Sequence, residues 1–111
     1  MKDTIIFSEE TSMCFEPGDD RYNHTFIKHS VNQFGTILQH RGYLYLPEIY
    51  EYLGVKFDLI ISPAKRSRCY FADDPIVFSY EISGINGKIF FKVLTGKDAL
   101  DYRKENEVDE I

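Results

Sequence analysis

The clearest pattern in the chain is an apolar stripe of helical period. Apolar residues recur at spacings of four, three and four positions, at Ile27, Val31, Phe34 and Leu38. Such spacing keeps these side chains on one face of an α-helix, because one turn contains about 3.6 residues. The pattern predicts a helix over residues 24–41 that packs through this face on the rest of the domain.

A second, shorter helix is predicted over residues 47–53. Pro47 suits the first turn of a helix, because the N–H that proline lacks has no partner there. Gly54 can take the left-handed conformation that commonly ends a helix. Between the two helices, residues 43–46 alternate tyrosine with leucine, which indicates a short extended connection.

The remaining apolar runs are short and rich in β-branched and aromatic residues, which is typical of strands. Strands are predicted over residues 55–61, 69–72, 76–83 and 88–94. Asn86-Gly87, between the last two, is the dipeptide favoured in tight hairpin turns. Residues 4–8 and 12–15 indicate a small N-terminal hairpin or an edge strand. The sequence thus predicts one α+β domain with two helices packed on a small antiparallel β-sheet.

The C-terminal segment differs in composition from the rest of the chain. Residues 97–111 hold six acidic residues against three basic ones and few apolar residues. We expect this segment to begin as a helical turn through Ala99, Leu100 and Tyr102 and to continue as an acidic, partly disordered tail. The folded domain would then cover residues 1–96.

Composition and charge narrow the class of protein. The chain has 111 residues, of which 43% are hydrophobic and 28% charged, as expected for one globular domain. No run approaches the length of a membrane span, no signal peptide is recognisable, and the two cysteines cannot form a disulfide framework, so we expect a cytoplasmic protein. The net charge is −5, yet residues 21–70 hold seven bases against three acids. Acidic ends therefore flank a basic middle.

No arrangement of residues indicates catalysis or a cofactor. His24 and His29 are five positions apart, which directs them to different faces of a helix, and no Cys-x-x-Cys pair occurs. Glycine-rich phosphate-binding motifs and a nucleophile elbow are also missing from the sequence. The sequence therefore predicts a protein without enzymatic activity, without a metal and without a cofactor.

The candidate site is a partner-binding face made of tyrosines and a basic loop. It comprises Tyr43, Tyr45, Tyr52, Lys65, Arg66, Arg68 and Tyr70. Tyrosine is enriched at protein interfaces because it combines a large apolar area with a polar tip. Basic residues beside aromatic ones also suit the phosphates and bases of nucleic acid, so that alternative stays open. A homodimer through an exposed strand edge also stays open.

Residues 31–54 resemble a segment of small phage-encoded and prophage-encoded proteins of unknown function. The shared features are a helix that ends in Arg41-Gly42-Tyr43 and a short helix that ends in Leu53-Gly54. The resemblance implies a bacterial or phage cytoplasm and transfers no catalytic or binding residue. We therefore expect a non-catalytic module that inhibits or modulates a host or defence protein by covering its surface. If that protein handles nucleic acid, the acidic ends of this chain would mimic the phosphate charge that it binds. The alternatives are a small nucleic-acid-binding or regulatory domain and an immunity-type protein.

Overall fold

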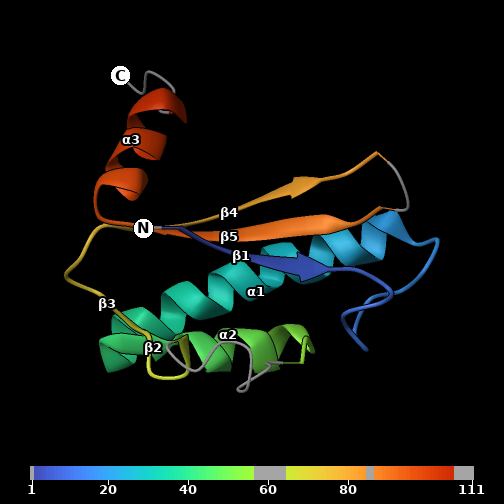
Figure 1. Cartoon of the computed structure of the whole chain (residues 1–111), viewed down its shortest axis with the longest axis horizontal. Helices are drawn as coiled ribbons and strands as arrows, with labels where there is room; N and C mark the ends of the chain where they lie inside the picture. The colour runs from blue at the N-terminus through green and yellow to red at the C-terminus, as the bar shows by residue number, and fades with distance from the viewer. Residues whose placement is uncertain (1, 57–64, 85–86, 107–111) are drawn as a thin grey trace.

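The computed structural model, which describes residues 2–56, 65–84 and 87–106, has an α+β fold with two antiparallel sheets (Figure 1). The elements follow in the order β1 (Lys2–Phe7), α1 (Asp20–Arg41), β2 (Tyr43–Tyr45), α2 (Leu46–Leu53), β3 (Cys69–Phe71), β4 (Ile76–Ile82), β5 (Ile89–Thr95) and α3 (Lys97–Asn106). This confirms the predicted fold class of a single α+β domain. No helix in the described part of the chain is long and apolar enough to cross a membrane.

The main sheet has the strand order β1-β5-β4, so the first strand of the chain pairs with the last. Side chains alternate between its two faces, and β1 buries Asp3, Ile5 and Phe7 on the face that meets the helices. The buried stripe of α1 packs on this face, where the Phe34 ring lies 5.9 Å from the ring of Phe91 on β5. An aromatic core thus fixes α1 to the sheet.

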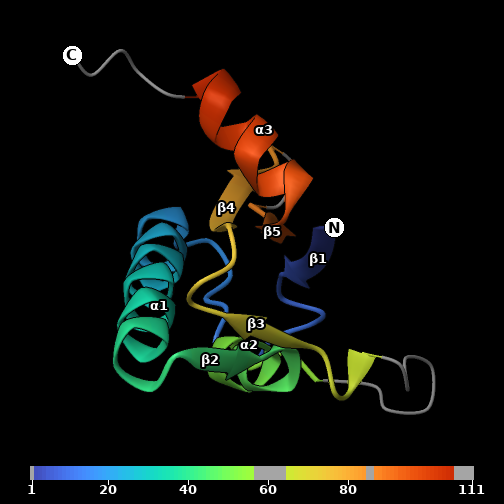
Figure 2. The same cartoon turned by 90° about the vertical axis from the view of Figure 1, so that its left-hand side faces the viewer.

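The second sheet is a two-stranded ribbon of β2 and β3, which we call the ribbon. Tyr43 lies opposite Phe71, Leu44 opposite Tyr70, and Tyr45 opposite Cys69. Leu44 and Tyr70 are buried toward the domain, whereas the tyrosines of β2 point outward. Figure 2 shows the ribbon beside α2 on one side of the main sheet and α3 on the other side.

The prediction of a single sheet is wrong. The alternation of apolar and polar residues along a strand indicates which face is buried, but it does not indicate which strand lies beside it. β3 pairs with β2 rather than with β4, and β1 pairs with β5 rather than with residues 12–15. The N-terminal hairpin is therefore not formed, and β1 is an edge strand of the main sheet. Ser12 makes only an isolated bridge to Val55. The rest of the strand predicted over residues 55–61 lies outside the described residues from position 57 onward.

Two helix boundaries also differ from the predictions. α1 begins at Asp20, because the Asp19 side chain accepts a hydrogen bond from the Tyr22 amide and caps the helix. At the C-terminus, α3 continues to Asn106 where a fraying tail was expected. Ala99, in the first turn of α3, is fully buried and anchors the helix on the sheet. Residues 107–111 lie outside the described part of the chain.

Candidate interaction surface

The outer face of the ribbon carries a group of exposed aromatic side chains. Tyr43 is 37% exposed, Tyr45 is 42% exposed and Phe71 is 50% exposed. The Tyr43 and Tyr45 rings meet edge to face with centroids 5.7 Å apart, and Phe71 lies directly opposite Tyr43 on the neighbouring strand. The three rings therefore form one aromatic patch, which we call the ribbon face.

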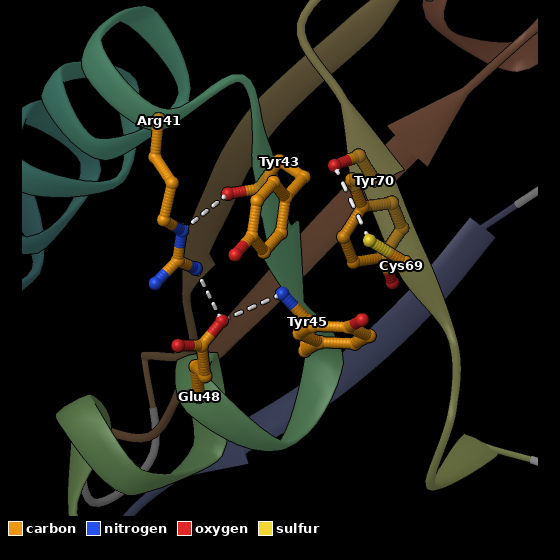
Figure 3. A network of polar contacts seen from close by, with 6 residues as sticks. All are labelled: Arg41, Tyr43, Tyr45, Glu48, Cys69 and Tyr70. Carbon is orange, nitrogen blue, oxygen red and sulfur yellow. Dashed lines mark hydrogen bonds and ion pairs between the residues drawn. The ribbon is translucent and has the colours of Figure 1, made fainter.

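An ion pair closes the outer edge of β2, as Figure 3 shows. Arg41 Nε donates to the Tyr43 carbonyl at 3.1 Å, and the Tyr45 amide donates to Glu48 Oε1 at 2.8 Å. Arg41 Nη2 lies 2.6 Å from the same Glu48 oxygen. Two of the backbone groups that β2 directs away from β3, the Tyr43 carbonyl and the Tyr45 amide, are thus satisfied by the last residue of α1 and a residue in the first turn of α2.

The same ion pair holds Tyr43 in place. The Arg41 guanidinium carbon lies 4.4 Å from the centroid of the Tyr43 ring, which is the geometry of a cation–π contact. The hydrogen bond from Arg41 holds the pKa of Glu48 below its usual value, and the bond to Glu48 raises the pKa of Arg41. One edge of the ribbon face is therefore ordered before any partner binds.

A buried carboxylate lies behind the ribbon. Asp3 on β1 is 4% exposed and accepts hydrogen bonds from Arg68 Nη1 at 2.5 Å and from the Tyr70 hydroxyl at 2.6 Å. Lys65 Nζ lies 3.9 Å from the same carboxylate. Burial, reinforced by the bond to Asp3, raises the pKa of the Tyr70 phenol. Asp3 thus ties β1 to β3 and offsets the charge of the loop before β3.

The structure divides the predicted site residues between the surface and the interior. Tyr43 and Tyr45 lie on the ribbon face, and Arg66 is exposed in the turn before β3. Tyr70 is only 4% exposed, so it supports the ribbon from behind and cannot contact a partner on its outer face. Tyr52 is half-buried on α2, where its ring packs edge to face on Phe34 with centroids 5.3 Å apart.

Lys65 and Arg68 are also placed differently from the prediction, because both point at Asp3. The sequence reasoning missed Phe71 as a member of the aromatic patch. The signal was present in the alternation of the strand, since Tyr70 and Phe71 must lie on opposite faces. Once Tyr70 is assigned to the interior, Phe71 follows as the exposed residue.

Other candidate sites gain little from the structure. Within residues 2–56, 65–84 and 87–106, no group of three or more histidine, cysteine or acidic side chains is placed to hold a metal ion. His24 Nε2 lies 2.9 Å from the Tyr80 hydroxyl. Cys14 and Cys69 are free thiols, and the Cys69 thiol lies 3.9 Å from the Tyr70 carbonyl (Figure 3).

The acidic ends of the chain do not merge into one acidic face. Glu9, Glu10 and Asp20 line a hollow of about 530 Å³ beside Lys88, at the end of the sheet where α1 begins. α3, which carries Asp98, Asp101 and Glu105, stands at the opposite end of the sheet (Figure 1). Within the described part of the chain, the acidic residues of the two ends therefore lie on separate surfaces.

Comparisons of the chain with protein-family models, with curated proteins and with solved structures give no match. The resemblance of residues 31–54 to phage-encoded proteins therefore stays a prediction, and the case for function rests on the ribbon face.

Proposed function

We propose that the protein is a non-catalytic binding module whose ribbon face contacts a partner protein. The observation that carries this proposal is the aromatic patch of Tyr43, Tyr45 and Phe71, three large exposed side chains on one face of a short ribbon. Aromatic residues are enriched at the centres of protein interfaces, whereas charged residues are depleted there. The ribbon face has this composition.

The charges around the ribbon favour a protein partner over nucleic acid. Affinity for nucleic acid depends mainly on cations that neutralise phosphates. Lys65 and Arg68 instead face the buried carboxylate of Asp3, and Arg41 faces Glu48. Arg66 is the remaining cation of the predicted basic loop. An aromatic patch with its neighbouring cations already compensated suits a neutral, partly apolar surface on a protein.

Order within the patch also supports a binding role. Association costs free energy when side chains lose rotamer freedom, so an interface that is ordered beforehand binds more tightly. Tyr43 is packed between the Arg41 guanidinium and the Tyr45 ring before any partner arrives. The partner class that we propose, from the resemblance of residues 31–54, is a bacterial host or defence protein that is inhibited when its surface is covered.

The test compares two variants in capture experiments from bacterial lysate, with and without nuclease. Tyr43→Ser/Phe71→Ser removes two rings of the ribbon face, and Ile6→Ser/Leu100→Ser removes two exposed apolar side chains elsewhere, which are 41% and 52% exposed. We expect one stoichiometric protein that survives nuclease, is lost with the first variant and is retained by the second. Circular dichroism confirms that both variants fold.

Two outcomes contradict the proposal. If the ribbon variant captures the same protein as the wild type, the ribbon face is not the binding surface. If the captured material disappears after nuclease treatment, the alternative of a nucleic-acid-binding domain is favoured. In that case Arg66→Ala should lower the affinity and its salt dependence, because a lost phosphate contact reduces both.

A further inference from the structure

The outer edge of β4 carries unpaired backbone groups. In an antiparallel pair, residues that exchange hydrogen bonds with the partner alternate with residues whose N–H and C=O groups point away. The bonds from Ser83 N to Lys88 O at 2.7 Å, and from Gly96 N to Pro75 O at 3.2 Å, fix this alternation at both ends of β4. Phe78, Tyr80 and Ile82 therefore direct their backbone groups away from β5.

Side chains satisfy some outward backbone groups at the other strand edges. On β2, Arg41 donates to the Tyr43 carbonyl and Glu48 accepts from the Tyr45 amide, and on β1 the Thr11 hydroxyl donates to the Ile6 carbonyl at 2.6 Å. On β4, Arg103 donates to the Ile76 carbonyl at 2.9 Å, but only at the start of the strand. From Phe78 to Ile82, no described residue bonds to the outward backbone groups.

The side chains from Phe78 to Ile82 also do little to prevent another strand from pairing with this edge. Proteins usually guard an edge strand with charges, proline, a bulge or a covering segment. The segment from Phe78 to Ile82 carries a single charge, at Glu81, and contains no proline. Figure 1 shows β4 along the margin of the main sheet, with α3 near its first residues. Such an edge is a template for a further strand.

We propose that β4 pairs antiparallel with β4 of a second copy of this chain, which joins two three-stranded sheets into one of six strands. The two-fold axis passes through Tyr80, so that Tyr80 faces its own copy and Phe78 faces Ile82 of the partner. Outward-facing residues then meet outward-facing residues, as hydrogen bonding requires. The apolar side chains of both copies lie opposite apolar side chains.

Charge favours this register, because it brings Glu81 near a lysine of the second copy. With the axis at Tyr80, Glu81 lies opposite Ser79 of the second copy, and Ser79 is flanked on β5 by Lys92. Glu81 already pairs with Lys92 of its own chain, with Nζ and Oε2 3.0 Å apart. An axis through residue 81 would place Glu81 opposite Glu81 of the second copy. An axis through residue 79 would place Glu81 opposite Val77 of the second copy. Like charges directly opposite one another destabilise a strand pair.

This second surface goes beyond the proposed function and does not depend on it. The dimer uses the edge of the main sheet and leaves Tyr43, Tyr45 and Phe71 uncovered on each copy. Two ribbon faces held on one rigid sheet would bind a repeated or dimeric partner more tightly than a single one, because the second contact becomes intramolecular.

The test measures the dimer dissociation constant by sedimentation of the full chain over a dilution series. Ser79→Glu places a carboxylate opposite Glu81 of the second copy. Thr4→Glu is the matched control, because Thr4 flanks Lys92 on the same face but from β1. We expect Ser79→Glu to weaken the dimer about tenfold, since two-fold symmetry repeats each like-charge pair. Thr4→Glu should leave it unchanged, and Ser79→Glu/Glu81→Lys should restore it.

Amide hydrogen exchange identifies the interface independently of charge. In the dimer, the amides of Phe78, Tyr80 and Ile82 should exchange slowly and should become faster on dilution, whereas the amides of β1 that face outward should not respond. A chain that remains monomeric at about 1 mM overturns the proposal. So does a dimer in which these three amides stay unprotected, or one that both glutamate variants weaken equally. None of these outcomes bears on the proposal that the ribbon face contacts a partner protein.

Discussion

Two arginine–carboxylate pairs flank the ribbon, and they differ in environment rather than in chemistry. Arg41 and Glu48 are 2.6 Å apart, with side chains 37% and 39% exposed. Arg68 and Asp3 are 2.5 Å apart, with side chains 25% and 5% exposed. Solvent screens the first pair, so it adds little to stability and serves mainly to cap the β2 backbone. The second pair is shielded, so each partner depends on the other.

The two pairs also differ in the distance along the chain that they span. Arg41 and Glu48 are seven positions apart, and the pair joins two consecutive helices. Asp3 and Arg68 are 65 positions apart, and the pair joins the first strand to the ribbon. The local pair orders a surface, whereas the distant pair holds the halves of the fold together. Substitutions should therefore separate the two roles.

The largest effect is expected for Asp3→Ala. This substitution leaves the Arg68 guanidinium and the Tyr70 hydroxyl without their acceptor behind the ribbon, which should lower the free energy of unfolding by about 3 kcal/mol. Urea denaturation measures the loss. Glu81→Ala is the control, because it breaks an ion pair whose carboxylate side chain is 68% exposed. Equal losses for the two variants would show that burial does not distinguish these pairs.

A smaller effect is expected for Tyr70→Phe. The phenylalanine keeps the ring in the core but removes the hydroxyl that donates to Asp3. The free energy of unfolding should fall by about 2 kcal/mol, because a hydrogen bond to a charged group is lost. The loss should overlap with that of Asp3→Ala when the two are combined, since both break one network. Strictly additive losses in urea denaturation would argue against a shared network.

The buried phenol of Tyr70 should also make the folded protein less stable at high pH. Burial and the Asp3 carboxylate raise the folded-state pKa of Tyr70 above the ordinary value of 10.0. The contribution of neutral Tyr70 to the free energy of unfolding is therefore complete below about pH 10. As the pH rises further, the free energy of unfolding falls by up to about 1.4 kcal/mol per pH unit. Denaturation followed between pH 9 and 12 should show this decline. Tyr70→Phe should decline less steeply, and an identical slope would exclude Tyr70 as its source.

The smallest effect is expected for Glu48→Ala at the exposed pair. The free energy of unfolding should fall by less than about 1 kcal/mol. The folded-state pKa of Glu48 is lowered, so its contribution is present above the unfolded pKa near 4.5 and is lost as the pH falls through the folded value. The Tyr45 amide loses its acceptor and should exchange faster. Unchanged exchange at Tyr45 would show that Glu48 does not cap β2.

The sequence predicted most elements but not how distant segments pair. The stripe of Ile27, Phe34 and Leu38 identified α1, because helical periodicity is a local signal. The pairing of β1 with β5 was missed, since strand alternation gives the buried face and not the neighbour. Only the first turn of α3 was predicted, because Ala99 is the only buried residue of this helix, which leaves almost no apolar stripe to detect.

The candidate site was predictable to a similar extent. Alternation along residues 43–46 correctly placed Tyr43 and Tyr45 together on one side of a strand. The position of Lys65 and Arg68 could not be foreseen, because their acceptor is Asp3, at the other end of the sequence. Local patterns thus indicate which residues share a face, and only the tertiary structure shows which charges are compensated.

The pairing of β1 with β5 has a consequence for folding during synthesis. Phe7 pairs with Ile89 and Lys2 with Leu94, so the main sheet cannot close until most of the chain has been made. At about 5–20 residues per second, β1 waits for several seconds with its apolar face unpaired. Contacts between such distant residues slow folding because the intervening loop must close first. Throughout this interval the apolar side chains of β1 are accessible to chaperones.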